Sequence, residues 1–343
     1  MVNPAVPVID AEVALECQNT LGEGLLWDSK QQLLHWVDID TAEIHTFDPQ
    51  TSKYSVDAYP ETRYVTALAL RKDELGFIGT IAHDIVLFPA PTTPTSTMTP
   101  STPKPRKTLK TLSSPLPSDE MMANITRMND GGCDPAGRFF AGSMTLPELK
   151  DGKKRGELWR VDPDGKETKI LAEVGTSNGI GWSPDGRAMY YIDSVFDEIS
   201  VFDYDNSTGT PTNRRVFANS PPPIDEEHPT QGIFDGLTVD GVGNVWSARW
   251  KDSRVIGFRP DGSIICHIRL RDCKSPTIPC FGGKDLNTMY IATAHSKLAR
   301  EGDIQDTFPH SGDLYKLDFG EGSEVRKLLA ADWKGRERNR FSA

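Results

Sequence analysis

The sequence contains few cysteines and none of them is spaced as a C-x-x-C pair. An odd total of five predicts reduced thiols, as in cytosolic proteins, and not a disulfide framework. The first sixteen residues carry two prolines and three acidic side chains, where a signal peptide has a basic end followed by an apolar block. We therefore expect a cytoplasmic protein.

Long apolar runs and excess basic charge are also missing. No stretch approaches the roughly 18 uninterrupted apolar residues of a transmembrane helix. Lysine and arginine total 38 against 49 acidic residues, for a formal net charge of −11, which makes nucleic acid and anionic membranes poor partners. With 343 residues and 37% hydrophobic content, we expect one domain over 1–343, as a monomer or weak dimer.

Familiar catalytic motifs are absent. No serine stands in G-x-S-x-G, so Ser143 is interpreted as a small residue at a strand end. The GGK sequence beginning at Gly282 lacks the other residues of a phosphate-binding loop, and the seven histidines show no ligand spacing. A serine nucleophile, a phosphate-binding loop and a histidine-ligated zinc site are therefore disfavoured.

The apolar periodicity of long helices is missing too, while glycine (29) and proline (25) are frequent. What recurs is a short apolar run, a turn rich in Asp, Pro, Gly or Lys, and an aromatic or aliphatic strand ending in small residues. Each copy is predicted to form a β-hairpin. The six copies span 24–39, 66–80, 130–144, 179–194, 236–249 and 281–294.

A second, weaker set of segments alternates with the first, at 44–54, 85–90, 156–171, 199–217, 254–268 and 312–328. Two hairpins per repeat give four antiparallel strands, and radial repetition of such sheets is typical of a β-propeller. The sequence thus predicts an all-β fold, a six-bladed β-propeller with four antiparallel strands per blade. We expect the leading segment 13–19 to pair with the last blade and close the ring. A two-domain β-sandwich or an open β-solenoid accounts less well for six copies of one hairpin.

Two tracts lengthen this repeat. The first is a Thr/Pro/Ser-rich insertion at 89–119, and the second is a proline-rich and acidic segment at 220–230. Such compositions are typical of loops or disordered segments. We expect both to be loop-like or disordered, and the first to be mobile and to take no part in the chemistry.

A polar residue stands near the start of four predicted inner strands, just before a glycine or one residue earlier. In a propeller these positions converge on the central channel, so we expect the four side chains to face one another. They are Glu23, Asn129, Asn178 and Asp235. The alternative is that each merely caps its own turn.

Two carboxylates and two amides at one point would repel or shift in pKa unless a cation compensated them. We therefore predict one divalent metal ion. An oxygen-only donor set favours a hard cation such as Ca²⁺, and Mg²⁺, Mn²⁺, Zn²⁺ or Fe²⁺ remain alternatives. Few protein ligands leave coordination positions for water and substrate.

These motifs resemble the family of senescence marker protein, regucalcin and gluconolactonase over nearly the whole chain. The resemblance rests on LGEGLLWD, LHWVDI, RMNDGGCDPAGRFFAGSM, SNGIGWSPDGRAMYYIDS, FDYDNSTG, FDGLTVDGVGNVWSA and CFGGKDLNTMYIATA. It implies a six-bladed propeller that hydrolyses sugar lactones. It also implies that Glu23, Asn178 and Asp235 bind the catalytic metal, while Arg127 and Asn129 contact the substrate.

A further substrate-contacting glutamate is implied shortly after Gly142-Ser143-Met144, where Glu148 stands about one place later than the family pattern. The expected activity is metal-dependent opening of small aldonolactones, with Asp235 also accepting a proton from water. An organophosphate or other ester hydrolase on the same scaffold is one alternative. A calcium-binding propeller without turnover is the other.

Overall fold

The structure is a computed structural model, and it describes residues 6–97, 102–117, 125–149, 151–221 and 232–342. Apart from three short 3-10 helices, the described secondary structure is β-strand, so the fold is all-β. These helices are Ser194–Phe196, Ser296–Ala299 and Arg326–Leu328. No helix within the described ranges is long and apolar enough to cross a bilayer.

The strands form sheets whose members follow one another along the chain. The first sheet contains β2 (Gly22–Asp28), β3 (Leu33–Asp38), β4 (Glu43–Asp48) and β5 (Lys53–Ala58), with β9 (Ser96–Thr97) and β10 (Lys104–Pro105) at its outer edge. The second contains β6 (Val65–Leu70), β7 (Phe77–Ile81), β8 (Asp84–Phe88) and β11 (Lys110–Ser113). The third contains β12 (Thr126–Cys133), β13 (Phe139–Thr145), β14 (Gly156–Val161) and β15 (Glu167–Val174).

The fourth sheet contains β16 (Ser177–Trp182), β17 (Ala188–Asp193), β18 (Glu198–Asp205) and β19 (Thr210–Asn219). The last is an eight-stranded sheet in the order β20 (Ile233–Val239), β21 (Val245–Trp250), β22 (Arg254–Phe258), β23 (Ile264–Leu270), β1 (Val8–Leu15), β26 (Leu314–Asp318), β25 (Thr288–Ala294) and β24 (Ser275–Gly282). All six segments of the first predicted set pair as hairpins: 24–39, 66–80, 130–144, 179–194, 236–249 and 281–294.

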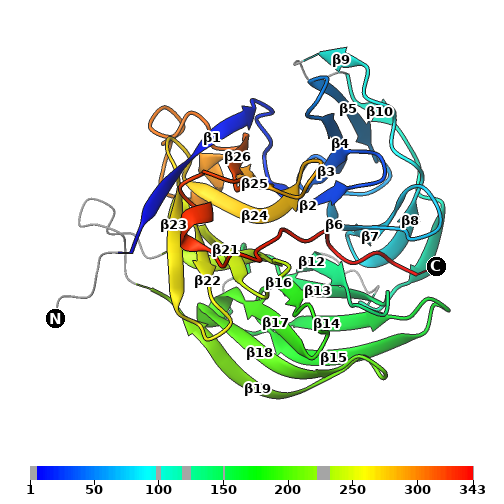
Figure 1. The fold of residues 1–343 in the computed structure, drawn as a ribbon. Helices are drawn as coiled ribbons and strands as arrows, with labels where there is room; N and C mark the ends of the chain where they lie inside the picture. The colour runs from blue at the N-terminus through cyan, green and yellow to red at the C-terminus, as the bar shows by residue number, and fades with distance from the viewer. Residues whose placement is uncertain (1–5, 98–101, 118–124, 150, 222–231, 343) are drawn as a thin grey trace.

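Strands β2, β6, β12, β16, β20 and β24 contact one another in this order, and β24 also contacts β2. We call these the inner strands. Figure 1 shows the sheets arranged radially around them, as in a β-propeller. Apolar side chains fill the space between neighbouring sheets; between the first sheet and β24–β26, for example, Trp27 stacks on Tyr290 with ring centroids 6.3 Å apart.

The leading strand pairs with the end of the chain, as predicted. In β1, Val13 lies opposite Tyr315 of β26 in antiparallel register, while Ile9 lies opposite Ile268 of β23 in parallel register. The strand begins at Val8 and ends at Leu15, earlier than the expected segment 13–19. Because it pairs on both edges, β1 leaves no open edge between the two halves of the eight-stranded sheet.

Two segments of the second set are not hairpins, contrary to expectation. Segment 85–90 supplies only β8, and 312–328 supplies β26 followed by a 3-10 helix. The outer partners come from elsewhere: β11 pairs with β8, and β1 pairs with β26. The pairing of β1 was expected from closure of the ring, whereas β11 was not expected because it lies more than twenty residues after β8 in the chain.

The expectation that 89–119 is loop-like or disordered is wrong for three short segments of its described part. Lys110–Ser113 is the outer strand of the second sheet, and the two short strands β9 and β10 pair with β5. Both contacts cover the outer edge of a sheet that would otherwise expose unpaired backbone groups. Most of the second tract, 220–230, lies outside the described residues.

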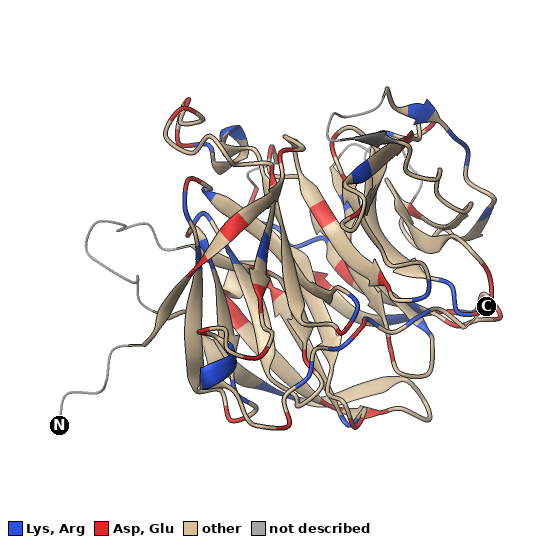
Figure 2. Cartoon of the chain, turned by 45° about the horizontal axis from the view of Figure 1, so that its top comes forward, with Lys and Arg blue, Asp and Glu red and all other residues tan. Residues whose placement is uncertain are grey.

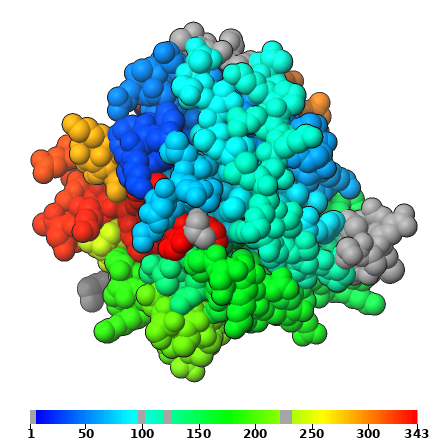
Figure 3. Space-filling view, turned by 90° about the vertical axis from the view of Figure 1, so that its right-hand side faces the viewer, coloured from blue at the N-terminus to red at the C-terminus, as the bar shows by residue number. Residues whose placement is uncertain are grey.

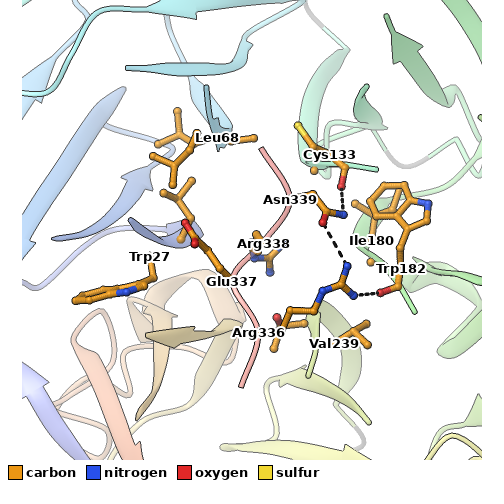
Figure 4. A pocket seen from close by; sticks show the side chains of 16 residues that line it. Trp27, Leu68, Cys133, Ile180, Trp182, Val239, Arg336, Glu337, Arg338 and Asn339 are labelled. Carbon is orange, nitrogen blue, oxygen red and sulfur yellow. Dashed lines mark hydrogen bonds between the residues drawn. The ribbon is translucent and has the colours of Figure 1, made fainter. Parts of the chain in front are cut away.

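The last residues of the chain lie across the ring, on the side where the inner strands have their C-terminal ends (Figure 4). We call residues 336–342 the C-terminal segment. It bonds to all six inner strands through Arg336 to Trp182 O (2.8 Å), Arg338 to Leu237 O (2.7 Å) and Pro279 O (3.4 Å), Asn339 to Cys133 O (3.0 Å), Arg340 to Asp28 (2.8 Å) and the Phe341 amide to Leu70 O (2.8 Å). In the space-filling view its last residues, in red, reach the surface between the cyan and green parts of the chain (Figure 3).

This segment should contribute to stability because Phe341 is fully buried against the second and third sheets. We expect Phe341→Ala to lower the free energy of unfolding by about 3–5 kcal/mol, the usual cost of emptying a buried phenylalanine site. Urea unfolding followed by tryptophan fluorescence measures this change. The control is Leu75→Ala, at a side chain 63% exposed, which should change stability by less than about 0.5 kcal/mol. An unchanged urea midpoint for Phe341→Ala would show that the fold does not depend on this buried contact.

Candidate functional site

One cavity of about 640 Å³ opens at the end of the ring where the inner strands begin. All six residues singled out in the sequence line it: Glu23, Arg127, Asn129, Glu148, Asn178 and Asp235. Five of them are at most 8% exposed, whereas Glu148 lies on the rim with a side chain 73% exposed. Residues more than two hundred positions apart in the sequence thus share one site.

A break in strand pairing accompanies each of the four converging polar residues. Register shifts occur between Glu23 and Leu26, Met128 and Gly131, Ser177 and Ile180, and Phe234 and Leu237. A β-bulge bends its strand and re-aims a side chain that regular alternation would direct elsewhere. Bulging therefore explains how these side chains come to line the cavity from within strands and not from loops.

Glycine beside the polar residue allows this geometry. Gly24 has φ +58°, a left-handed conformation that other residues rarely adopt. At Gly179, an added Cβ would lie 2.8 Å from the backbone of both Asp235 and Leu237. The absence of a side chain at Gly179 therefore lets β16 and β20 approach closely enough for Asn178 and Asp235 to line the same cavity.

The loops that lead into two inner strands are held by aspartates at the end of the next strand. Asp38 accepts hydrogen bonds from the backbone amides of Thr20 (2.7 Å) and Leu21 (2.9 Å), just before β2. Asp193 does the same for Gly175 and Thr176, both at 2.9 Å, just before β16. These contacts fix the entry of the strands that carry Glu23 and Asn178.

A chain of hydrogen bonds joins the neutral and basic groups of the site. Arg127 donates from Nη1 to Asn129 Oδ1 at 2.6 Å, and Asn129 Nδ2 donates to Asn178 Oδ1 at 2.9 Å. Asn178 Nδ2 donates to Ser194 Oγ at 2.8 Å, and Ser194 donates in turn to Phe234 O at 2.7 Å. This chain fixes the amide orientation of Asn178, so that Oδ1 retains one lone pair for a further ligand.

The two carboxylates lack such partners. Glu23 accepts only from the amide of Gly24, at 3.2 Å, and no basic side chain of the described residues forms an ion pair with Glu23 or Asp235. Burial raises the pKa of Glu23 well above its ordinary value, and the carboxylates of Asp235 and Asp130 raise it further. Burial and then Asp130 raise the pKa of Asp235 likewise. The site is therefore electrostatically unfavourable to two ionised acids unless a cation is bound.

Asp130 was not predicted as a site residue. Its Oδ1 accepts from the amide of Gly131 at 2.7 Å, while Oδ2 is buried without a hydrogen-bond partner among the described residues. Burial raises its pKa, and the guanidinium of Arg338 in the C-terminal segment acts in the opposite direction. Regular strand alternation would place Asp130 on the face opposite Asn129, so only knowledge of the bulge could have revealed its proximity to both acids.

The cavity is also lined by residues that the sequence did not suggest, among them Asp40, Arg63, Tyr64, Ser194 and Trp250. Glu148 is bound here by Arg300, whose Nη2 lies 3.0 Å from its Oε1. Acidic and basic positions are interspersed along strands and loops of the molecule, as Figure 2 shows, so charge alone does not mark this cavity.

A second group of possible metal ligands, Asp38, Glu43 and His45, is already bonded internally. Both oxygens of Asp38 accept backbone amides, as described above. His45 bonds to the hydroxyl of Tyr54 and lies 3.5 Å from Glu43, which also accepts from Thr41 at 2.9 Å. The oxygen cluster of Glu23, Asn178 and Asp235 fits a cation better, because its carboxylates have no basic partner among the described residues and Asn178 Oδ1 keeps one lone pair free.

Comparison with known proteins gives a consistent result. A family model described as SMP-30/Gluconolactonase/LRE-like region matches residues 21–295. Regucalcin of Gallus gallus is 33% identical over 318 residues (90% of this chain, 95% of the relative), and a pentonolactonase of Haloferax volcanii is 30% identical over 308 residues (87% and 90%). A solved structure of a calcium-binding regucalcin from Agrobacterium tumefaciens has a TM-score of 0.77 at 25% identity and covers 98% of this chain and 99% of that one. The chain therefore belongs to the SMP-30/gluconolactonase/LRE-like family.

Proposed function

We propose that this protein is a lactonase that opens small sugar lactones to aldonic acids with the aid of one bound divalent cation. The proposal rests above all on two buried carboxylates that lack a cationic partner and share an open cavity with a guanidinium and two amides. Relatives that cover most of this chain are named for lactone hydrolysis or for calcium binding. We further propose that the chain is a single domain and that each inner strand begins one of six blades.

The residues of the site fit a hard divalent cation. Glu23, Asn178 and Asp235 offer oxygen donors from β2, β16 and β20, and the donor chemistry suits Ca²⁺, Mg²⁺ or Mn²⁺. A cation bound there would offset the repulsion between the acids that raises their pKa values. When bound, it would polarise the lactone carbonyl as a Lewis acid.

The other steps fall to side chains of this chain. Asp235 lines the cavity and, once ionised, can accept a proton from a water molecule that attacks the carbonyl carbon. Arg127 and Asn129 are held together at 2.6 Å, and Arg127 has further N–H donors while Asn129 Oδ1 can accept one more hydrogen bond, so they can orient substrate hydroxyl groups. Glu148 can contact a substrate only from the rim, where it is paired with Arg300.

Two other functions use the same cavity, namely ester or organophosphate hydrolysis and calcium binding without turnover. Lactone hydrolysis is favoured over binding alone because Arg127 is buried beside the acids although a structural ion would not need it. Activity towards a panel of lactones, aryl esters and phosphotriesters separates the two enzymes, and turnover of none of them with any ion would favour the binding function.

We expect Asp235→Asn to reduce kcat for D-glucono-1,5-lactone by at least about a hundredfold, because the proton acceptor is lost. Hydrolysis is followed by acid release with each of Ca²⁺, Mn²⁺, Mg²⁺ and Zn²⁺ at saturation, and with chelator. The matched control is Asp203→Asn, which alters an exposed acid of β18 outside the cavity and should keep near wild-type activity. Near wild-type turnover by Asp235→Asn with the ion bound would overturn its assigned role.

The raised pKa of Glu23 predicts how stability depends on pH and metal. A carboxyl whose pKa is higher in the folded than in the unfolded protein contributes stability at low pH that is lost as pH rises through the folded pKa. In the presence of chelator, therefore, the melting temperature of the wild type should fall below that of Glu23→Gln as the pH is raised. The difference should grow from about pH 4, the ordinary carboxyl pKa, towards pH 8.

Saturating Mn²⁺ or Ca²⁺ should restore the melting temperature of the wild type at the upper end of this range and have little effect on Glu23→Gln. Thermal unfolding by differential scanning fluorimetry, with the exposed Glu12→Gln as control, measures both effects. Parallel pH profiles for wild type and Glu23→Gln in chelator would contradict the electrostatic account of the site.

A further inference from the structure

Two guanidinium groups lie over one aromatic ring at the edge of the cavity. Arg63 Cζ is 4.9 Å and Arg127 Cζ is 5.4 Å from the centroid of the Tyr64 ring. The backbone of Tyr64 is fixed because its carbonyl accepts from Thr62 Oγ1 at 3.1 Å and from the Ala82 amide at 3.2 Å. The ring therefore holds both cations at a defined place just before β6.

This pair lies at the outer end of the hydrogen-bonded chain described above. From Asn178 the contacts run to Asn129, then to Arg127, and then across the Tyr64 ring to Arg63. Arg127 is 7% exposed, whereas Arg63 is exposed on the rim of the same cavity. A molecule that extends from Asn178 along these contacts would place its far end at Arg63.

Arg63 and Arg127 are the basic side chains of the described cavity lining that have no acidic partner. Arg300 is paired with Glu148 at 3.0 Å, and Lys251 lies 3.9 Å from Glu301. Neither Arg63 nor Arg127 forms an ion pair with any carboxylate in the described part of the chain.

Asp40 is the acid that acts electrostatically on both guanidiniums, from beyond ion-pair distance. With a divalent cation between Glu23 and Asp235, two guanidiniums would then face one carboxylate. The outer cavity is therefore suited to an anion, because guanidinium groups form their strongest hydrogen bonds with carboxylate and phosphate oxygens.

We propose that Arg63, Tyr64 and Arg127 form an anion subsite, and that the preferred substrates are sugar lactones carrying a carboxylate or phosphate at the end remote from the lactone carbonyl. Arg63 is the specificity-determining residue of this subsite, since Arg127 also contacts the inner site. The inference rests on the proposed lactonase function and narrows its substrate class.

The test compares kcat/KM for a neutral lactone, D-glucono-1,5-lactone, with two anionic ones, 6-phospho-D-glucono-1,5-lactone and D-glucaro-1,4-lactone, at saturating cation. Wild-type protein should favour at least one anionic lactone, and the favoured one identifies phosphate or carboxylate as the recognised group. Arg63→Met should reduce kcat/KM for that lactone about tenfold or more while changing the neutral lactone less than about twofold. Arg63→Lys should keep part of the kcat/KM for the anionic lactone that Arg63→Met loses. Added salt should weaken the preference of the wild type for the anionic over the neutral lactone.

Arg300→Met is the matched control, because Arg300 lines the same cavity but is already paired with Glu148. An equal effect of Arg63→Met and Arg300→Met on the anionic lactone would indicate general attraction by the rim and overturn the subsite. So would an equal effect of Arg63→Met on neutral and anionic lactones.

Failure of the proposed function has a separate signature, namely no hydrolysis of any lactone by wild-type protein. In that case the subsite is tested by calorimetric titration of D-glucarate. Binding to wild type that weakens about tenfold in Arg63→Met and not in Arg300→Met supports the subsite, and equal or undetectable binding to the three proteins refutes it.

Discussion

Close approach of the inner strands is the constraint on which the rest of the structure depends. Six strands can surround one axis only where small residues let their backbones come together, as Gly179 does between β16 and β20. The same approach brings polar side chains from distant parts of the chain into one cavity. Buried acids near one another are electrostatically costly, so the geometry that builds the ring also creates the demand for a cation.

Much of this was visible in the sequence because the hairpins repeat. Turn chemistry and short apolar runs identified the six hairpins that begin with the inner strands. The polar residue beside a glycine identified Glu23, Asn178 and Asp235 as neighbours in the cavity. The roles of these residues remain proposals. The likeness of the motifs to one family agreed with the later match over residues 21–295.

The parts that escaped prediction did so for separate reasons. β11 comes from a Thr/Pro/Ser-rich tract whose composition is typical of loops, and only the unpaired edge of β8 explains why it becomes a strand. Asp130 was missed because a bulge reverses the expected side-chain alternation. Arg63 and Tyr64 were missed because nothing in their local sequence differs from an ordinary turn.

The pairing of β1 with β26, and the contacts of the C-terminal segment with every inner strand, have a consequence for synthesis. During translation the earliest strand emerges from the ribosome some three hundred residues before its partner. β1 can pair with β23 as soon as that strand is made, but its other edge stays open until β26 follows. Partial products can assemble individual sheets, but they cannot assemble a closed wheel.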